Sequence, residues 1–161
     1  MTDLYGPAQL ARLLGLPEPT PEQAAVIAAP LRPGLVVAGA GSGKSETMAA
    51  RVVWLVANGR VRPEHVLGLT FTRKAAAELA ERVRKRLDQL RGAGAVPDEV
   101  LDGEPTVATY HSYAIRLVGD HALREAVEPN TRLVSPAVAW QLAHRVVSTY
   151  DGPMDAVTSA P

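Results

Sequence analysis

The 161-residue sequence contains no cysteine, which excludes disulfide bonds and thiolate metal sites. Aromatic residues make up only 4% of the chain, so Leu, Val, Ile and Ala must form most of any core. The four histidines lack the spacing of a metal site. They are His65, His111, His121 and His144. These scarcities favour an intracellular domain held together by aliphatic packing.

Long apolar runs and a leader-like start are also missing from the sequence. No apolar stretch approaches the roughly 20 residues of a membrane-spanning helix. The first ten residues, MTDLYGPAQL, lack the basic start and apolar stretch of a signal peptide. We therefore expect a cytoplasmic protein without a membrane partner. At 47% hydrophobic and 21% charged residues, the chain can form one domain with a real core.

Net charge is zero, which argues against a binder of nucleic acid that relies on overall charge. However, residues 73–91 hold seven basic and three acidic residues. This local excess would suit a phosphate backbone. Alternatively, the segment is a solvated helix face with Glu78–Arg82 and Glu81–Lys85 pairs. The composition leaves both interpretations open.

Apolar periodicity and turn residues predict strands that alternate with helices. The predicted strands are 35–38, 66–71 and 106–110. The predicted helices are 7–14, 20–28, 43–57, 73–91, 112–126 and 135–150, with a frayed tail at 151–161. Thr20 and Pro21 have the residue types of an N-cap and a first helical position. Such alternation is typical of an α/β fold, a mostly parallel sheet covered by helices.

A glycine-rich loop follows the first predicted strand and has Walker A spacing, with Ala in place of the first Gly. Its residues are Ala38, Gly39, Ala40, Gly41, Ser42, Gly43, Lys44 and Ser45. Glycines let backbone N–H groups approach phosphate, and the following helix favours an anion at its N-terminus. Lys44 would bind the β- and γ-phosphates as the catalytic residue, and the Ser45 hydroxyl would bind Mg²⁺.

The loop therefore predicts a site for a nucleoside triphosphate, with ATP and Mg²⁺ as cofactors. The alternative is a glycine-rich turn with an incidental Gly-Lys-Ser. The strand before the loop and the helix after it make that alternative the weaker one. The loop does not identify the reaction, because kinases, transport ATPases, GTPases and helicases share it.

Three further segments narrow the function: Thr20-Pro21-Glu22-Gln23, Leu69 to Leu79 (LTFTRKAAAEL) and Thr109-Tyr110-His111-Ser112. Together with VVAGAGSGKS, they resemble the Q motif and motifs I, Ia and Ib of superfamily 1 helicases of the UvrD/Rep/PcrA type. The resemblance covers roughly residues 20–150. The runs EQAAVIAAP and ETMAARVVWLVANG are also similar to actinobacterial AdnAB-type helicase–nuclease subunits, whose nuclease domain these residues do not contain.

The resemblance implies a RecA-like P-loop NTPase fold. Residues 1–129 would belong to the ATP-binding domain 1A, and residues 130–161 to the start of the inserted helical 1B region. The implied full-length enzyme is an ATP-dependent DNA helicase or translocase on single-stranded DNA, acting 3′ to 5′ in repair or recombination. Its implied partners are single-stranded and duplex DNA and, for the AdnAB type, a second helicase–nuclease subunit.

The resemblance also assigns roles to single residues. Gln23 would bind the adenine edge of ATP, although it also lies three residues after Thr20, as in a capping box. Single-stranded DNA would contact Thr70, Phe71, Thr72, Arg73, Tyr110 and His111. The alternatives are that Phe71 packs in the core, that Thr72 only N-caps the following helix, and that Tyr110 and His111 serve packing.

The sequence departs from the family at two positions. Glu46 stands where an Arg near the nucleotide is common, and Arg73 stands where Asn is common. No acidic Walker B run and no second motor domain are found, so the sequence looks truncated before the Walker B strand. We expect the 161 residues alone to be inactive. The alternatives are a P-loop small-molecule kinase and a non-catalytic nucleotide- or DNA-binding module.

Overall fold

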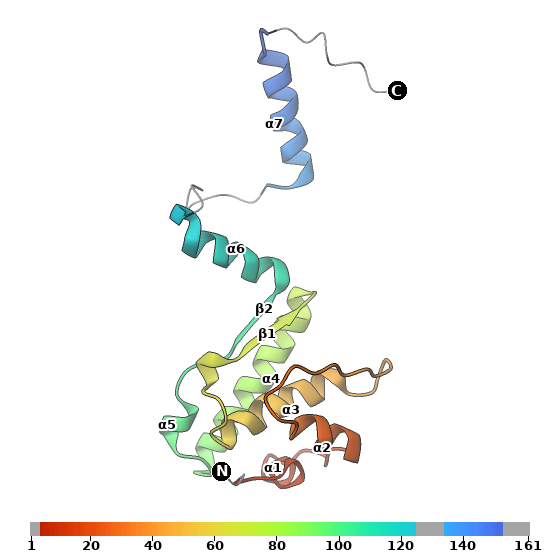
Figure 1. Ribbon diagram of the computed structural model, residues 1–161, viewed down its shortest axis with the longest axis vertical. Coiled ribbons are helices and arrows are strands. Elements are labelled where there is room, and N and C mark those ends of the chain that lie inside the picture. Colours follow the sequence, from red (N-terminus) through yellow and green to blue (C-terminus); the bar gives the residue numbers. More distant parts are fainter. Residues whose placement is uncertain (1–3, 125–133, 153–161) are drawn as a thin grey trace. The chain divides into compact units, whose positions relative to one another are not determined.

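The computed structural model describes residues 4–124 and 134–152 (Figure 1). The chain divides into two compact units, residues 1–115 and 116–161. The end of the helix predicted at 112–126, and the tail predicted beyond residue 152, lie outside the described residues. Within the first unit, the order of elements is helical first and then alternates strand and helix, as an α/β fold requires.

The first unit contains a parallel sheet formed by β1 (Leu67–Thr70) and β2 (Thr106–Thr109). Their register pairs Leu67 with Thr106 and Thr70 with Thr109, so both strands end at the same edge. The connecting helix α4 (Arg73–Gly92) packs against both strands. This crossover confirms the α/β prediction. The two strands are each shorter than predicted, and β1 is half-buried rather than buried.

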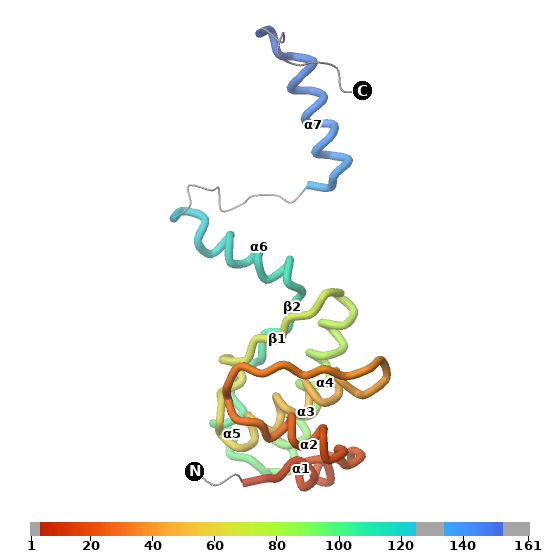
Figure 2. Tube along the Cα trace, turned by 45° about the vertical axis from the view of Figure 1, so that its right-hand side comes forward, coloured from red at the N-terminus to blue at the C-terminus, as the bar shows by residue number. Residues whose placement is uncertain are grey.

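The first predicted strand, residues 35–38, is not a strand in the structure. The segment is extended and exposed, with Leu35 and Val37 exposed to 89% and 87% (Figure 2). A strand needs a neighbour for its backbone hydrogen bonds, and the sheet in the described residues pairs only β1 with β2. The prediction of a strand here is therefore wrong: the residues have the composition of a strand, but the described structure offers them no strand to pair with.

Helix α3 (Lys44–Ala57) lies at the centre of the core. Val53 and Val56 are fully buried on this helix and pack with Leu90 of α4. Its Trp54 indole N–H donates to the backbone oxygen of Tyr5 at 2.7 Å. Asn58, at the end of the helix, accepts from the Tyr5 backbone N–H at 2.9 Å. Aliphatic side chains thus form most of the core, as the low aromatic content predicts.

Two short helices precede the phosphate loop: α1 (Pro7–Leu13) and α2 (Pro21–Ile27). The carboxyl end of α2 is held by Arg51 of α3, whose guanidinium donates to the backbone oxygens of Val26 and Ile27 at 2.8 and 3.0 Å. Since the last carbonyls of a helix lack partners within it, this cation fixes α2 to α3. Gln23 of α2 is thereby held next to the phosphate loop.

Elsewhere the helices match their predictions with small differences. Between α4 and β2, where the sequence analysis predicts neither helix nor strand, the structure contains a short helix, α5 (Asp98–Leu101), whose Leu101 is fully buried. Helix α6 (Tyr110–His121) begins two residues earlier than predicted and is followed by the 3-10 turn η2 (Ala122–Arg124). A second 3-10 turn, η1 (Pro63–His65), precedes β1.

Helix α7 (Pro136–Thr149) belongs to the second unit. It begins one residue after the predicted start, and the Ser135 hydroxyl caps it by accepting from the Val138 N–H at 3.3 Å. Across the described ranges 4–124 and 134–152, the helices all fall short of the length and apolarity that a membrane crossing demands.

Candidate nucleotide site and nucleic-acid edge

The glycine-rich loop ends at Gly43, which is the N-cap of α3. Gly41 and Gly43 have φ values of 77° and 79°, in the left-handed region that glycine adopts without strain. Between them, the Ser42 hydroxyl donates to the Gly39 oxygen at 2.8 Å and holds the loop in a tight turn. Alternation of left- and right-handed residues turns successive N–H groups toward one point, which is the geometry of an anion site.

Lys44 is the first residue of α3, and its ammonium group folds back onto the loop. Its Nζ donates to the backbone oxygens of Ala38 and Gly39, at 3.0 and 2.5 Å. Lys44 is nevertheless exposed, so its ammonium remains accessible to solvent and to a ligand. An ammonium has three donors, so one donor remains for an anion even in this arrangement.

Ser45 follows Lys44 in the first turn of α3 and is exposed. Its hydroxyl is a suitable single ligand for Mg²⁺, which keeps several waters and is completed by substrate phosphates. The part of the chain that the structure describes has no group of three His, Asp or Glu residues able to hold a metal ion by themselves. The residues therefore fit a Mg²⁺ that arrives with a nucleotide.

Gln23 makes both of the contacts that a capping box requires, together with one contact to the loop. Its Oε1 accepts from the Thr20 N–H at 3.0 Å, and its own N–H donates to the Thr20 hydroxyl at 3.3 Å. Its Nε2 donates to the Ser42 oxygen at 3.1 Å. A carboxamide has two donors and two lone pairs, so one donor and one lone pair remain. The capping contacts and the binding of an adenine edge are therefore compatible.

Gly43 lies at the point where this side chain meets the helix. A Cβ added at Gly43 would stand 3.0 Å from Gln23 Nε2 and 3.9 Å from the Glu46 Cβ. Any other residue would have to displace the carboxamide and adopt a strained positive φ. The Gln23 carboxamide therefore lies against the last residue of the phosphate loop.

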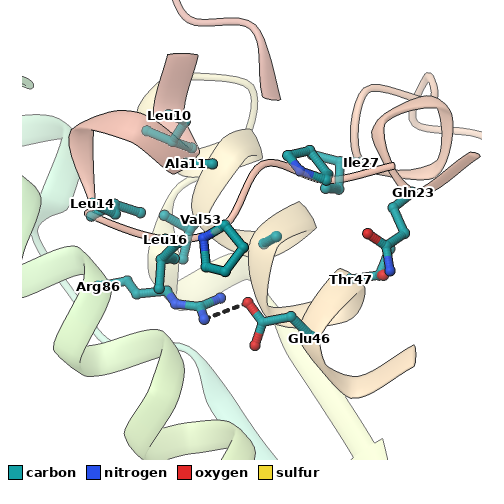
Figure 3. A pocket seen from close by; sticks show the side chains of 13 residues that line it. Leu10, Ala11, Leu14, Leu16, Gln23, Ile27, Glu46, Thr47, Val53 and Arg86 are labelled. Atoms are coloured by element: carbon teal, nitrogen blue, oxygen red, sulfur yellow. Dashed lines mark hydrogen bonds and ion pairs between the residues drawn. The ribbon is translucent and has the colours of Figure 1, made fainter. Parts of the chain in front are cut away.

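Glu46 is bound by two arginines of α4, which the sequence did not predict. The carboxylate accepts from Nη2 of Arg86, as Figure 3 shows. Nε of Arg82 lies 3.7 Å from its second oxygen. The predicted pairs Glu78–Arg82 and Glu81–Lys85 are thus wrong: Glu78 pairs with Lys74 at 3.9 Å, and Glu81 pairs with Arg84. Tertiary contact with α3 outcompetes the local i,i+4 pairing.

Arg86 is unusual because its side chain is only 7% exposed. Its Nη1 is enclosed and has no hydrogen-bond partner in the described structure. Leaving a buried donor unpaired costs about 1–3 kcal/mol. A buried donor without a partner is rare in native structures and calls for an explanation beyond packing.

The residues expected to contact DNA gather at the carboxyl edge of the sheet. Thr70 ends β1, and Phe71, Thr72 and Arg73 follow directly. Tyr110 and His111 begin α6 directly after β2 ends at Thr109, rather than ending the strand as predicted. Because Thr70 and Thr109 are paired in register, the two segments are adjacent. The carboxyl edge of a parallel sheet is where ligands bind in open α/β folds.

Two aromatic rings mark this edge. Phe71 is 87% exposed and Tyr110 is 50% exposed, with ring centroids 5.3 Å apart. The alternative that Phe71 packs in the core is therefore wrong, and His111 is exposed as well. Thr72 does N-cap α4, since its hydroxyl accepts from the Ala75 N–H at 3.1 Å. Thr109, which belongs to the motif Ib segment but was given no contact with DNA, is buried and accepts from the Ser112 N–H at 3.1 Å, so it caps α6.

A glycine-rich loop at the N-terminus of a buried helix, in an α/β unit, defines the nucleotide-binding P-loop class. The model of the family described as "UvrD/REP helicase N-terminal domain" matches residues 19–154, and the chain belongs to this family. That match confirms the resemblance to UvrD/Rep/PcrA-type helicases.

Individual relatives agree with the family. The chain is 40% identical over 84 residues to DNA helicase IV of Escherichia coli, which covers 52% of the chain and 10% of that protein. It is 36% identical over 116 residues to the ATP-dependent DNA helicase PcrA of Staphylococcus aureus, and the match covers 71% of the chain and 14% of that protein. It is 32% identical over 126 residues to DNA helicase II of Escherichia coli, and the match covers 78% of the chain and 16% of that protein. The chain therefore spans only a tenth to a sixth of these relatives.

Proposed function

We propose that this chain forms the ATP-binding part of a motor domain in an ATP-dependent DNA helicase or translocase. The observation that carries the proposal is the pairing of two sites in one unit. A phosphate loop caps α3, and an exposed aromatic edge ends β1 and β2. The names of the relatives, which are DNA helicases, support ATP and DNA as the two ligands.

At the nucleotide site, the phosphates would bind the N–H groups of the loop from Gly39 to Ser45. Lys44 would exchange its contacts with the loop oxygens for contacts with the β- and γ-phosphates. Gln23 would bind adenine with its remaining donor and lone pair. Mg²⁺, held through the Ser45 hydroxyl, would supply charge neutralisation of the phosphates.

At the sheet edge, single-stranded DNA would lie across Phe71 and Tyr110, with Arg73 and His111 near its phosphates. Stacking on exposed rings and a nearby cation are the usual means of binding single strands without sequence preference. We extend the proposal to 3′-to-5′ movement in the cytoplasm during repair or recombination. The division into 1A (residues 1–129) and 1B (130–161) belongs to the same proposal. The relatives above give no support to an AdnAB-type assignment or a second subunit.

ATP hydrolysis by the full-length protein tests the proposal directly. Phosphate release should rise severalfold when single-stranded DNA is added, and duplex with a single-stranded tail should be unwound. A P-loop kinase would instead transfer phosphate to a small acceptor and ignore DNA. Nucleotide binding without hydrolysis, under all DNA conditions, would favour a non-catalytic module.

Replacement of Gln23 by Ala tests adenine recognition. We expect Gln23→Ala to weaken ATP binding by about 1–3 kcal/mol, by analogy with amide recognition of adenine, and to weaken GTP binding much less. Calorimetric titration of both nucleotides measures the difference. Thr20→Ala is the control, because it removes the hydroxyl half of the capping box and leaves the carboxamide in place. An equal loss for ATP and GTP in Gln23→Ala would assign the residue to capping alone.

A further inference from the structure

Glu46 is the third residue of α3 after the N-cap Gly43, a position from which a side chain can cap its own helix. Glutamate and glutamine at this position often turn back and accept from the backbone N–H of the N-cap residue. The corresponding residues of α1 and α2, Gln9 and Gln23, do so in this structure, at 2.7 and 3.0 Å from the N-cap nitrogen. Glu46 has a side chain of the right length for the same contact in α3, with a full negative charge in place of an amide.

The Glu46 carboxylate is instead paired with arginines of α4. Arg86 donates to one of its oxygens through Nη2, as Figure 3 shows. Nε of Arg82 lies 3.7 Å from the other oxygen. The side chain of Arg86 is only 7% exposed, whereas that of Glu46 is 49% exposed. The arginine is therefore the fixed member of the pair, and the carboxylate is the member that is free to turn elsewhere if α4 releases it.

The helix N-terminus that Glu46 leaves open is the proposed phosphate site. The Gly43 oxygen accepts from the Thr47 N–H at 2.8 Å, which is the first hydrogen bond of the helix. The N–H groups from Gly43 to Glu46 therefore have no acceptor within α3, and the helix dipole favours an anion beside them. The Glu46 Cβ lies 3.9 Å from the Cβ position of Gly43, so the carboxylate is within reach of these same N–H groups.

We propose that Arg86 and Arg82 are positioning residues that hold the Glu46 carboxylate away from the phosphate site, so that ATP does not compete with an anion of the chain itself. This inference rests on the proposed ATP site. A released carboxylate would occupy N–H groups that the phosphates need, and the apparent affinity would fall with the fraction of molecules whose site is free. The role also accounts for a buried guanidinium whose Nη1 lacks a partner among the described residues, because burial fixes the direction of Nη2.

The test removes both arginines from the full-length protein and measures ATP affinity by calorimetry. The double variant Arg82→Gln, Arg86→Met should bind ATP about tenfold more weakly, which corresponds to Glu46 occupying the site in roughly nine molecules out of ten. Adding Glu46→Ala to this variant should restore the wild-type affinity. Pyrophosphate, which lacks sugar and base, should show the same loss and the same recovery, because the competition takes place at the phosphates.

The matched control is the double variant Arg84→Gln, Lys85→Met, which removes two positive charges from exposed positions of the same turn of α4. It should bind ATP as the wild type does. An equal loss of affinity in this control would mean that net charge, and not the restraint of Glu46, causes the effect. That result overturns the inference.

The remaining outcomes separate the inference from the proposed function. Unchanged ATP affinity without the two arginines, or a loss that Glu46→Ala does not restore, overturns the inference. If Lys44→Ala still weakens ATP binding, the proposed site stands in both cases. Affinity that does not depend on Lys44 overturns the proposed function itself. Should the variant without both arginines fail to fold, Arg86→Met alone must show the loss, and its combination with Glu46→Ala must show the recovery.

Discussion

Lys44→Ala should abolish ATP hydrolysis by the full-length protein while leaving its fold intact. The ammonium is the positive charge that the loop brings to the terminal phosphates, and charge stabilisation is the main contribution of a protein to phosphoryl transfer. Loss of its charge-assisted hydrogen bonds should also weaken ATP binding by about 1.5–3 kcal/mol. Phosphate release and a binding isotherm, measured on the same preparation, would show both effects.

The structure explains why stability should not change. Lys44 is exposed, and its ammonium donates to the oxygens of Ala38 and Gly39 in an exposed loop. Surface substitutions of this kind usually alter stability by less than about 0.5 kcal/mol. Lys74→Ala is a matched control, because Lys74 is an exposed lysine at the start of α4 and pairs only loosely with Glu78. Near-normal hydrolysis in Lys44→Ala would remove the loop from the proposed mechanism.

The sequence predicts those features of the site that a few adjacent residues specify. The phosphate loop, the Thr20 and Ser135 caps and the start of α4 after Thr72 are specified by a few adjacent residues, and the structure contains them. The Thr20–Gln23 capping box is equally local. By contrast, the contact of Gln23 with Ser42 joins residues 19 positions apart, and no spacing pattern signals it.

The features that sequence analysis missed or misassigned depend on distant partners. Residues 35–38 have the composition of a strand, but pairing decides whether a strand forms. One of the two interpretations of residues 73–91 paired Arg82 with Glu78 of its own helix, whereas its partner is Glu46, 36 positions away. Arg51 caps α2 from α3 in the same way. The only sequence signal for the Glu46 cluster was the departure from the family at that position, which could not identify a partner.

The double replacement Phe71→Ala and Tyr110→Ala should weaken single-stranded DNA binding by roughly 2–6 kcal/mol, since stacking of a base on one ring is worth about 1–3 kcal/mol. The two rings lie 5.3 Å apart at the shared carboxyl edge of β1 and β2, so both are available to adjacent bases. Nucleotide affinity should stay within about twofold, because neither ring lines the pocket that contains Ala38, Ser42 and Lys44 of the phosphate loop. Fluorescence anisotropy with a labelled oligonucleotide and calorimetry with ATP measure the two affinities.

The size of the effect depends on the exposure of the rings in the folded protein. Phe71 is 87% exposed and contributes little to the core, so its removal should leave the thermal midpoint close to that of the wild type. Each single variant should lose about half of the binding free energy lost by the double variant, unless the two rings act on one base. Leu123→Ala, at another exposed apolar position, controls for general surface hydrophobicity and should bind DNA normally. DNA affinity unchanged in the double variant would mean that the strand lies elsewhere. A collapse of the thermal midpoint in both single variants would mean instead that the two rings hold the sheet edge together.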